Sequence, residues 1–242
     1  MGALKAIRIV TQILATVILL GAIAVTVAAI LTPAWQTVLV KVFNQEHQHG
    51  LWMDCVRGKS ITARNQREEQ KWTCTYKFNN PLEDEDEHGH SGHNHDHDGG
   101  EIQHKYLPWH KAVLALLSVA AAFGILSLLF SFCAPCIIAC SIVWSVCCII
   151  STACSIAGII VFFINSHDLD YRFIHGVGNA YEQERGYSFW CGVAGAVGFL
   201  TAAILAILTT VMFFVIKSQK KQKTVPTHVA YSWPKAPGQT SV

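Results

Sequence analysis

The stretch Ala112–Ser166, AVLALLSVAAAFGILSLLFSFCAPCIIACSIVWSVCCIISTACSIAGIIVFFINS, decides the fold, because its 55 residues include no charged side chain. A bilayer core about 30 Å thick needs about 20 apolar helical residues. A single helix of this length would extend ~80 Å at 1.5 Å per residue. Pro135 is the only proline in the stretch, and proline disfavours helix at the residue before it. We therefore predict two membrane spans, over 109–131 and 136–164, joined by a turn at 132–135.

Two more charge-free runs, Ile9–Val40 and Gly186–Ile216, flank this stretch. They predict spans over 7–31 and 189–216, which makes four spans in all. The first run is longer than the ~7–15 apolar residues of a signal peptide, so we expect it to stay in the protein. Charged residues make up 14% of the chain, against about 25% in soluble domains. The sequence thus indicates an integral membrane protein and excludes an ordinary soluble enzyme.

The charges beside the spans predict the orientation. Lys5 and Arg8 open the first span, and four lysines follow the fourth. By the positive-inside rule both ends face the cytoplasm, as expected for a multi-pass plasma-membrane protein. The predicted cytoplasmic segments are 1–6, 132–135 and 217–242, and the predicted outer loops are 32–108 and 165–188. Arg8 and Lys111, at span ends, are the only charges in the spans, so no transport path is expected.

The large outer loop contains two cysteines, Cys55 and Cys74. The extracellular side is oxidising, so these two residues are predicted to form a disulfide. Three segments around them are rich in β-branched and aromatic residues and predict strands of a small antiparallel sheet. These segments are Val38–Phe43, Gly50–Val56 and Lys71–Phe78, and residues 57–70 are predicted to be a hairpin connection or a short helix.

Six residues of this loop form a recognisable pattern: Trp35, then Gly50-Leu51-Trp52 and Cys55, then Cys74. In this pattern and in its four spans, the chain resembles the claudin superfamily, which includes peripheral myelin proteins and calcium-channel gamma subunits. It is most similar to the invertebrate claudin-like (Clc-like) proteins. The resemblance implies an all-α transmembrane four-helix bundle with a small antiparallel β-sheet in the first extracellular loop. The chain departs from claudins in a longer interval between the cysteines and in a histidine-rich insert.

The insert, residues 83–98, combines seven acidic residues with five histidines. Such a composition cannot form a packed core. One interpretation of the insert is a solvated linker without a specific ligand. We expect no cofactor elsewhere in the chain. The other is a Zn²⁺ or Cu²⁺ site, or a pH sensor, because imidazole binds these ions and titrates near pH 6.5. The candidate ligands are His88, His90, His93, His95 and His97.

Three cysteines lie at or near the predicted cytoplasmic turn: Cys133, Cys136 and Cys140. Three interpretations stay open. The cysteines are small residues at helix interfaces, or they are sites of S-palmitoylation. The spacing of Cys133 and Cys136 is also that of a metal site or a redox-active pair.

The tail is rich in lysine and proline and ends in Thr240-Ser241-Val242. A hydroxyl at Thr240 and an apolar last residue, Val242, are typical of a peptide that adds a strand to a PDZ domain. The lysines have a second interpretation, in which they contact anionic lipids of the inner leaflet.

The resemblance implies a junctional protein that mediates adhesion and forms a paracellular barrier or selective pore. Its partners would be the bilayer, like proteins in the same and the opposed membrane, and a PDZ scaffold. Tyr171 and Phe173 in the second outer loop are candidate adhesion residues, because aromatic side chains are enriched at interface centres; alternatively their rings rest on the membrane. Two other functions stay open, an auxiliary subunit of an ion channel or receptor and an extracellular metal or pH sensor. Neither an enzyme nor a nucleic-acid-binding protein is expected.

Overall fold

The computed structural model describes residues 2–40, 45–59, 70–77, 108–167, 173–176 and 179–224. Within these residues, four helices are long and apolar enough to cross a membrane. Their bounds are α1 (Gly2–Leu31), α2 (Pro108–Cys133), α3 (Ile138–His167) and α5 (Tyr187–Thr224). The four-helix fold predicted from the charge-free runs is confirmed.

The helices extend beyond the predicted spans. α1 begins at Gly2 rather than at residue 7, and α5 continues to Thr224 rather than 216. Hydropathy marks the part of a helix that fits the hydrocarbon, whereas lysine and glutamine are good helix formers that prolong α5 in water. The turn between α2 and α3 lies at residues 134–137, two positions later than predicted. Pro135 lies inside it, as expected, and the amide N–H groups of the turn donate back to carbonyl groups at the end of α2.

The bundle packs through small residues. α1 packs mainly against α5, and α2 against α3, which also packs against α5. Gly195 and Gly198 of α5 lie against Thr26 and Ala22 of α1, and a Cβ atom at position 198 would lie 2.8 Å from Ala22 Cβ. Close backbone approach of this kind stabilises helix pairs in membranes. The glycines of α5 therefore serve packing.

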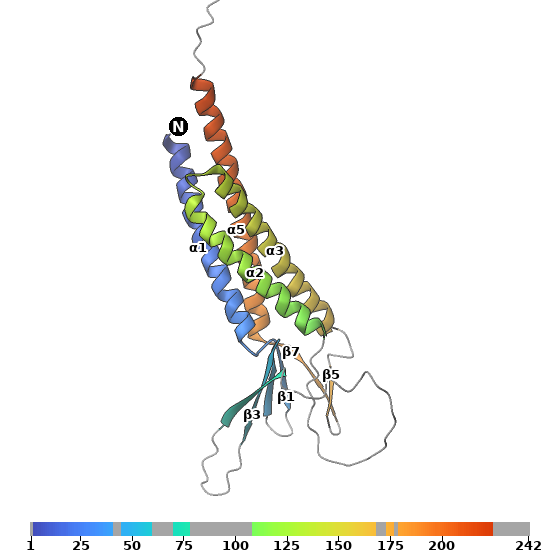
Figure 1. Ribbon diagram of the computed structural model, residues 1–242. Coiled ribbons are helices and arrows are strands. Elements are labelled where there is room, and N and C mark those ends of the chain that lie inside the picture. The colour runs from blue at the N-terminus through green and yellow to red at the C-terminus, as the bar shows by residue number, and fades with distance from the viewer. Residues whose placement is uncertain are drawn as a thin grey trace, which may run out of the picture.

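A five-stranded antiparallel sheet lies at one end of the bundle, with strand order β4-β3-β2-β1-β7 (Figure 1). A separate hairpin pairs β5 with β6. The strand bounds are β1 (Gln36–Val40), β2 (Gln45–His49), β3 (Met53–Lys59), β4 (Gln70–Tyr76), β5 (Phe173–Gly176), β6 (Asn179–Glu182) and β7 (Glu184–Arg185). Three of them, β1, β3 and β4, overlap the predicted strands. The other four were not predicted, and β3 continues into the predicted connection 57–70.

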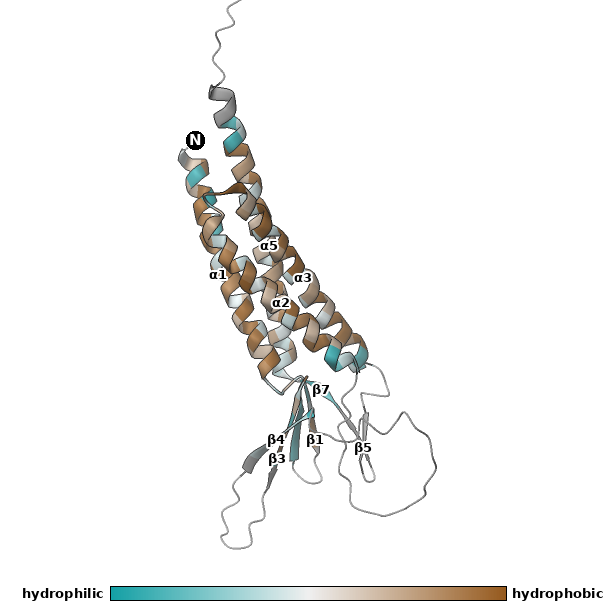
Figure 2. Cartoon of the chain, viewed as in Figure 1, coloured by the Kyte–Doolittle hydropathy of each residue, from teal (hydrophilic) through white to brown (hydrophobic). Residues whose placement is uncertain are grey.

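The bundle has an apolar middle and two polar ends. The start of α1 and the end of α5 lie together at the end of the bundle opposite to the sheet (Figure 1). Apolar residues cover the middle of the helices, and polar residues gather in the sheet and in the free end of α5 (Figure 2). An apolar band between two polar ends is the pattern of a membrane-spanning bundle.

Candidate functional site: the outer sheet and its junction with the helices

A disulfide joins the two strands at one side of the sheet. Cys55 of β3 lies directly opposite Cys74 of β4, with a Cα–Cα distance of 4.1 Å, and the two sulfur atoms are bonded. Cys55 is buried and Cys74 is exposed. The disulfide predicted from the sequence is therefore confirmed, and it fixes the pairing of β3 with β4.

Gly50 and Leu51 form a tight connection between β2 and β3 where the sheet meets the helices. The Gly50 N–H donates to the Met53 carbonyl oxygen at 2.9 Å. A Cβ atom at position 50 would lie 2.6 Å from that oxygen and 2.8 Å from the Pro33 Cα. Leu51 is fully buried. Glycine is thus required here because backbone closes on it from both sides.

Two tryptophans of the family pattern bind the end of α1. Trp35 Nε1–H donates to the Ala29 carbonyl oxygen at 2.8 Å, and Trp52 Nε1–H donates to the Ile30 carbonyl oxygen at 2.7 Å. The last four carbonyl groups of a helix have no donor within the helix, and Ala29 and Ile30 belong to the last turn of α1. The tryptophans therefore cap this helix as well as connecting it to the sheet.

Aromatic rings from the bundle surround Trp35, which is fully buried. Phe162 of α3 lies with its ring centroid 4.8 Å from that of Trp35, and Phe189 of α5 lies at 6.4 Å. Trp109 of α2 contacts Phe162 at 5.7 Å. These tilted and edge-on contacts are favourable arrangements for aromatic pairs. Each of α2, α3 and α5 therefore contributes a ring to this aromatic cluster, and α1 accepts a hydrogen bond from Trp35 through the Ala29 carbonyl oxygen.

A buried ionic cluster lies under the sheet. Lys77 Nζ donates to the Gly50 carbonyl oxygen at 2.8 Å and lies 3.3 Å from Asp54 Oδ1, and His49 Nδ1 lies 3.3 Å from the same carboxylate oxygen. The side chains of Lys77 and Asp54 are each 4% exposed. Burial lowers the pKa of Lys77, and the neighbouring Asp54 opposes that shift. Lys77, the residue that follows β4, thereby links that strand to β3 and to the Gly50 turn.

Sequence reasoning did not find this cluster. Asp54 and Lys77 lie inside the predicted strands Gly50–Val56 and Lys71–Phe78, and His49 directly precedes the first of them, but the sequence indicated no role for any of the three. Their proximity depends on the pairing of β2, β3 and β4. No local pattern in the sequence encodes that pairing.

The strand β4 forms one edge of the described sheet and carries two exposed aromatic side chains. Trp72 is 39% exposed and Tyr76 is 53% exposed. The Tyr76 ring stacks on Trp52 with a centroid distance of 5.4 Å, and the guanidinium group of Arg57 lies 5.6 Å from the Trp72 ring centroid. Cys74, whose disulfide joins β4 to β3, lies between these two aromatic residues in the strand. This face offers apolar area in a fixed position outside the membrane.

The second outer loop joins the same sheet. β7 pairs with β1, and the Ser188 N–H at the start of α5 donates to the Ala34 carbonyl oxygen at 3.0 Å. Phe173, a predicted adhesion residue, begins β5 opposite Glu182 of β6, whereas Tyr171 lies outside the described residues. Their role in adhesion stays a prediction.

The remaining predicted sites are only partly within the described chain. Cys133 and Cys136 are exposed at the turn after α2, and Cys140 is partly buried in α3, so their modification stays a prediction. The insert histidines, Thr240 and Val242 lie outside the described residues. Within the described part of the chain, no group of three His, Cys, Asp or Glu side chains could hold a metal ion.

Comparison with known proteins links this arrangement to one family. A model of the Clc-like family matches residues 7–219. Clc-like protein 2 of Caenorhabditis elegans is 29% identical over 202 residues, which is 77% of this chain and 69% of that protein. Clc-like protein 5 of the same organism is 26% identical over 200 residues, 76% of this chain and 64% of that protein. The chain thus spans about two thirds of the length of these relatives.

Proposed function

The chain belongs to the Clc-like family of claudin-like membrane proteins, and we propose that it acts in adhesion between neighbouring cells. Its outer sheet contacts like proteins in the same and in the opposed membrane. A row of such contacts makes a paracellular barrier or a selective pore. The protein lies in the plasma membrane, at cell–cell junctions, with both ends in the cytoplasm.

The observation that carries this proposal is the exposed aromatic pair, Trp72 and Tyr76, on an edge strand held by a disulfide. Large aromatic side chains dominate the energy of protein interfaces. An edge strand also offers unpaired backbone groups to a second strand. Because the sheet is already ordered by the disulfide and by the capped end of α1, binding costs little conformational entropy.

The proposed orientation is supported by charge and by redox chemistry. The sheet contains a disulfide, and disulfides persist in oxidising compartments rather than in the cytosol. The opposite end of the bundle carries Lys5 and Arg8 at the start of α1 and Lys217 near the end of α5. This placement agrees with the positive-inside rule. The tail that follows α5 would then be available to a cytoplasmic PDZ scaffold.

The experiment is to express the full chain in cells without junction strands and to compare variants for enrichment at contacts. The double substitution Trp72→Ser and Tyr76→Ser should reduce enrichment several-fold, because the interface loses its two large apolar side chains. The matched control is Thr73→Ala with Thr75→Ala, two exposed residues that alternate with the aromatic ones on the same strand. Surface labelling of each variant measures its delivery to the plasma membrane.

The control variant should keep wild-type enrichment. If the aromatic variant reaches the surface and still gathers at contacts like the wild type, this surface does not mediate adhesion. If the wild-type protein is absent from contacts and instead purifies with an ion channel whose gating it changes, the auxiliary-subunit function replaces the one proposed.

A further inference from the structure

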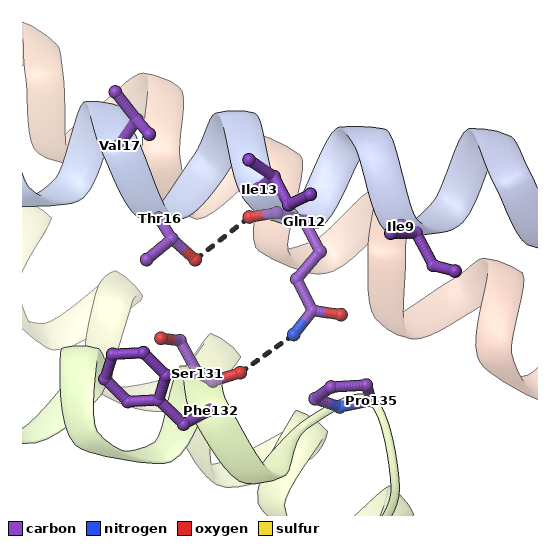
Figure 3. A pocket seen from close by; sticks show the side chains of 8 residues that line it. All are labelled: Ile9, Gln12, Ile13, Thr16, Val17, Ser131, Phe132 and Pro135. Atoms are coloured by element: carbon purple, nitrogen blue, oxygen red, sulfur yellow. Dashed lines mark hydrogen bonds between the residues drawn. The ribbon is translucent and has the colours of Figure 1, made fainter.

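A groove lies between α1 and α2 (Figure 3), near the start of α1 and the end of α2, which Figure 1 shows at the end of the bundle opposite to the sheet. Its volume is about 290 Å³, and its walls are mainly apolar. Ile9 and Ile13 of α1 and Phe132 of α2 are more than half exposed, at 56%, 60% and 71%. Both helices span the membrane. The groove therefore opens sideways toward lipid, not toward water.

Gln12 lines this groove, together with the smaller polar residues Thr16 and Ser131. Gln12 is only 7% exposed, and its Nε2–H donates to the Ser131 carbonyl oxygen at 2.8 Å. A carbonyl group can only accept, so the amide nitrogen must face Ser131 and the amide oxygen must face away. Figure 3 shows that oxygen directed into the space between α1 and Pro135. No described residue donates a hydrogen bond to it.

The hydroxyl groups nearby do not satisfy the Gln12 oxygen. Thr16 Oγ1–H donates to the Gln12 backbone carbonyl oxygen at 2.9 Å, and Ser131 Oγ–H donates to the Leu128 carbonyl oxygen at 2.7 Å. This oxygen is accessible from the groove, and apolar walls offer it no donor, so leaving it without a hydrogen bond in lipid is costly. The groove thus combines apolar walls with one unmet acceptor.

The depth of Gln12 restricts the kind of lipid group that can reach it. Arg8, one turn earlier on α1, donates to the Ala134 carbonyl oxygen of the α2–α3 turn at 3.1 Å. Gln12 follows four residues later, ~6 Å deeper along the helix. It therefore lies just inside the hydrocarbon, below the level where arginine and the turn meet the membrane surface. A hydroxyl group attached directly to an apolar skeleton can lie at this depth.

We propose that this groove binds a sterol, whose hydroxyl group donates to Gln12 Oε1 while its rings lie against Ile9, Ile13 and Phe132. An acyl chain alone would fill the apolar walls but leave the acceptor unmet. A rigid ring system also loses less conformational entropy on binding than a flexible chain does. Sterol content of the membrane would then change how closely α1 and α2 pack at this end of the bundle.

The test uses the purified full-length protein in phosphatidylcholine nanodiscs with a photoreactive sterol, followed by mass-spectrometric mapping of the adduct. The adduct should lie on Ile9–Val17 or on Ser131–Pro135. Gln12→Leu should reduce labelling about tenfold through loss of one hydrogen bond. Ile13→Trp, which fills the groove from an exposed position, should reduce it without disturbing the core. The matched control Thr11→Val removes a hydroxyl from α1 outside the groove and should label like the wild type.

Competition separates a sterol from other lipids. Unlabelled sterol should displace the probe, whereas its 3-methyl ether, a diacylglycerol and a ceramide should compete at least tenfold more weakly. The proposal is overturned if the ether or another lipid competes as well as the sterol. It is also overturned if folded Gln12→Leu and Ile13→Trp proteins, judged by an unchanged unfolding temperature, label like the wild type, or if the adduct lies on other helices.

Discussion

Gly50 is a residue at which a small substitution should cause a large loss of stability. Gly50→Ala would place a methyl group 2.6 Å from the Met53 carbonyl oxygen and 2.8 Å from the Pro33 Cα. Overpacking against side chains typically costs 1–3 kcal/mol, and backbone yields less than side chains do. We therefore expect a loss of about 3 kcal/mol or more, measured as a lower unfolding temperature and reduced surface delivery.

Gly21→Ala is the matched control for this substitution. Nothing lies within 4 Å of a Cβ atom at position 21, and alanine is the better helix former by ~0.5–1 kcal/mol. This variant should be as stable as the wild type or slightly more so. Equal stability of Gly50→Ala and Gly21→Ala would show that the Gly50 turn is less tightly packed than described.

The Lys77–Asp54 pair should reveal itself in a double-mutant cycle. Lys77→Met leaves the Asp54 carboxylate buried without its cation, and breaking one partner of a buried pair costs ~3–5 kcal/mol. Adding Asp54→Asn removes the uncompensated charge, so the double variant should be more stable than Lys77→Met alone. Thermal unfolding followed through tryptophan fluorescence measures both. Strictly additive losses would mean that the two charges do not interact.

Acid should weaken the sheet through His47. Burial lowers the pKa of His47 below 6.5, neighbouring His49 acts in the same direction, and Asp54 opposes both. The unfolded chain then binds more protons than the folded one, so stability rises with pH. Stability should therefore fall as the pH drops through 6.5 and go on falling until it reaches the lower folded pKa. His47→Gln should show a smaller drop in unfolding temperature between about pH 7.5 and about pH 5.5; an identical drop would exclude this role.

Among the structural elements, β3 and β4 depend on the disulfide. In the loop-entropy model, a bridge that closes about 20 residues is worth ~3 kcal/mol. Cys55→Ser and Cys74→Ser should each lower the unfolding temperature and leave one thiol that reacts with maleimide without reduction. Cys191→Ser, which removes a free cysteine from α5, is the control and should reach the surface normally. Normal delivery of all three variants would mean that the sheet does not need its bridge.

The helices could be predicted from the sequence, whereas two of the five strands of the sheet, β2 and β7, could not. A charge-free run such as Ala112–Ser166 has one physical solution in a membrane, because lipid cannot bond exposed backbone groups. β2 (Gln45–His49) is polar throughout, and it is a strand only because β1 and β3 supply backbone partners on both sides. The two-residue strand β7 likewise forms through its pairing with β1. β7 and β1 lie far apart in the sequence, and β2 has no apolar residue to mark one of its faces as buried, so no local pattern identifies either strand.

Features of the site could be predicted only where the sequence allowed few arrangements. Cys55 and Cys74 had one possible pairing in their loop, so the disulfide could be inferred. The roles of Trp35 and Trp52 as caps for the carbonyl groups of α1 could not, since they depend on the position of the helix end beneath the sheet. The acceptor on Gln12 was equally hidden, because only the fold shows which of its atoms is bonded.

Considered as a whole, the molecule displays one rigid, disulfide-linked sheet on four spanning helices. Both outer loops contribute strands to it, and rings from α2, α3 and α5 together with the end of α1 hold it in place. Rigidity at the junction matters for adhesion, since a freely moving sheet would lose more entropy on meeting a second copy. In the proposed function, the exposed strand β4 is the surface that meets a neighbour.

The adhesive function is tested most directly in a mixed culture of cells that express the fluorescent full-length protein and cells that do not, by measuring fluorescence at the contacts between them. Adhesion between opposed sheets needs a copy on each side. The protein should therefore concentrate at contacts between two expressing cells and stay uniform at contacts between an expressing and a non-expressing cell. Equal fluorescence at both kinds of contact, in cells whose surface labelling shows normal delivery, would contradict the proposed adhesive function.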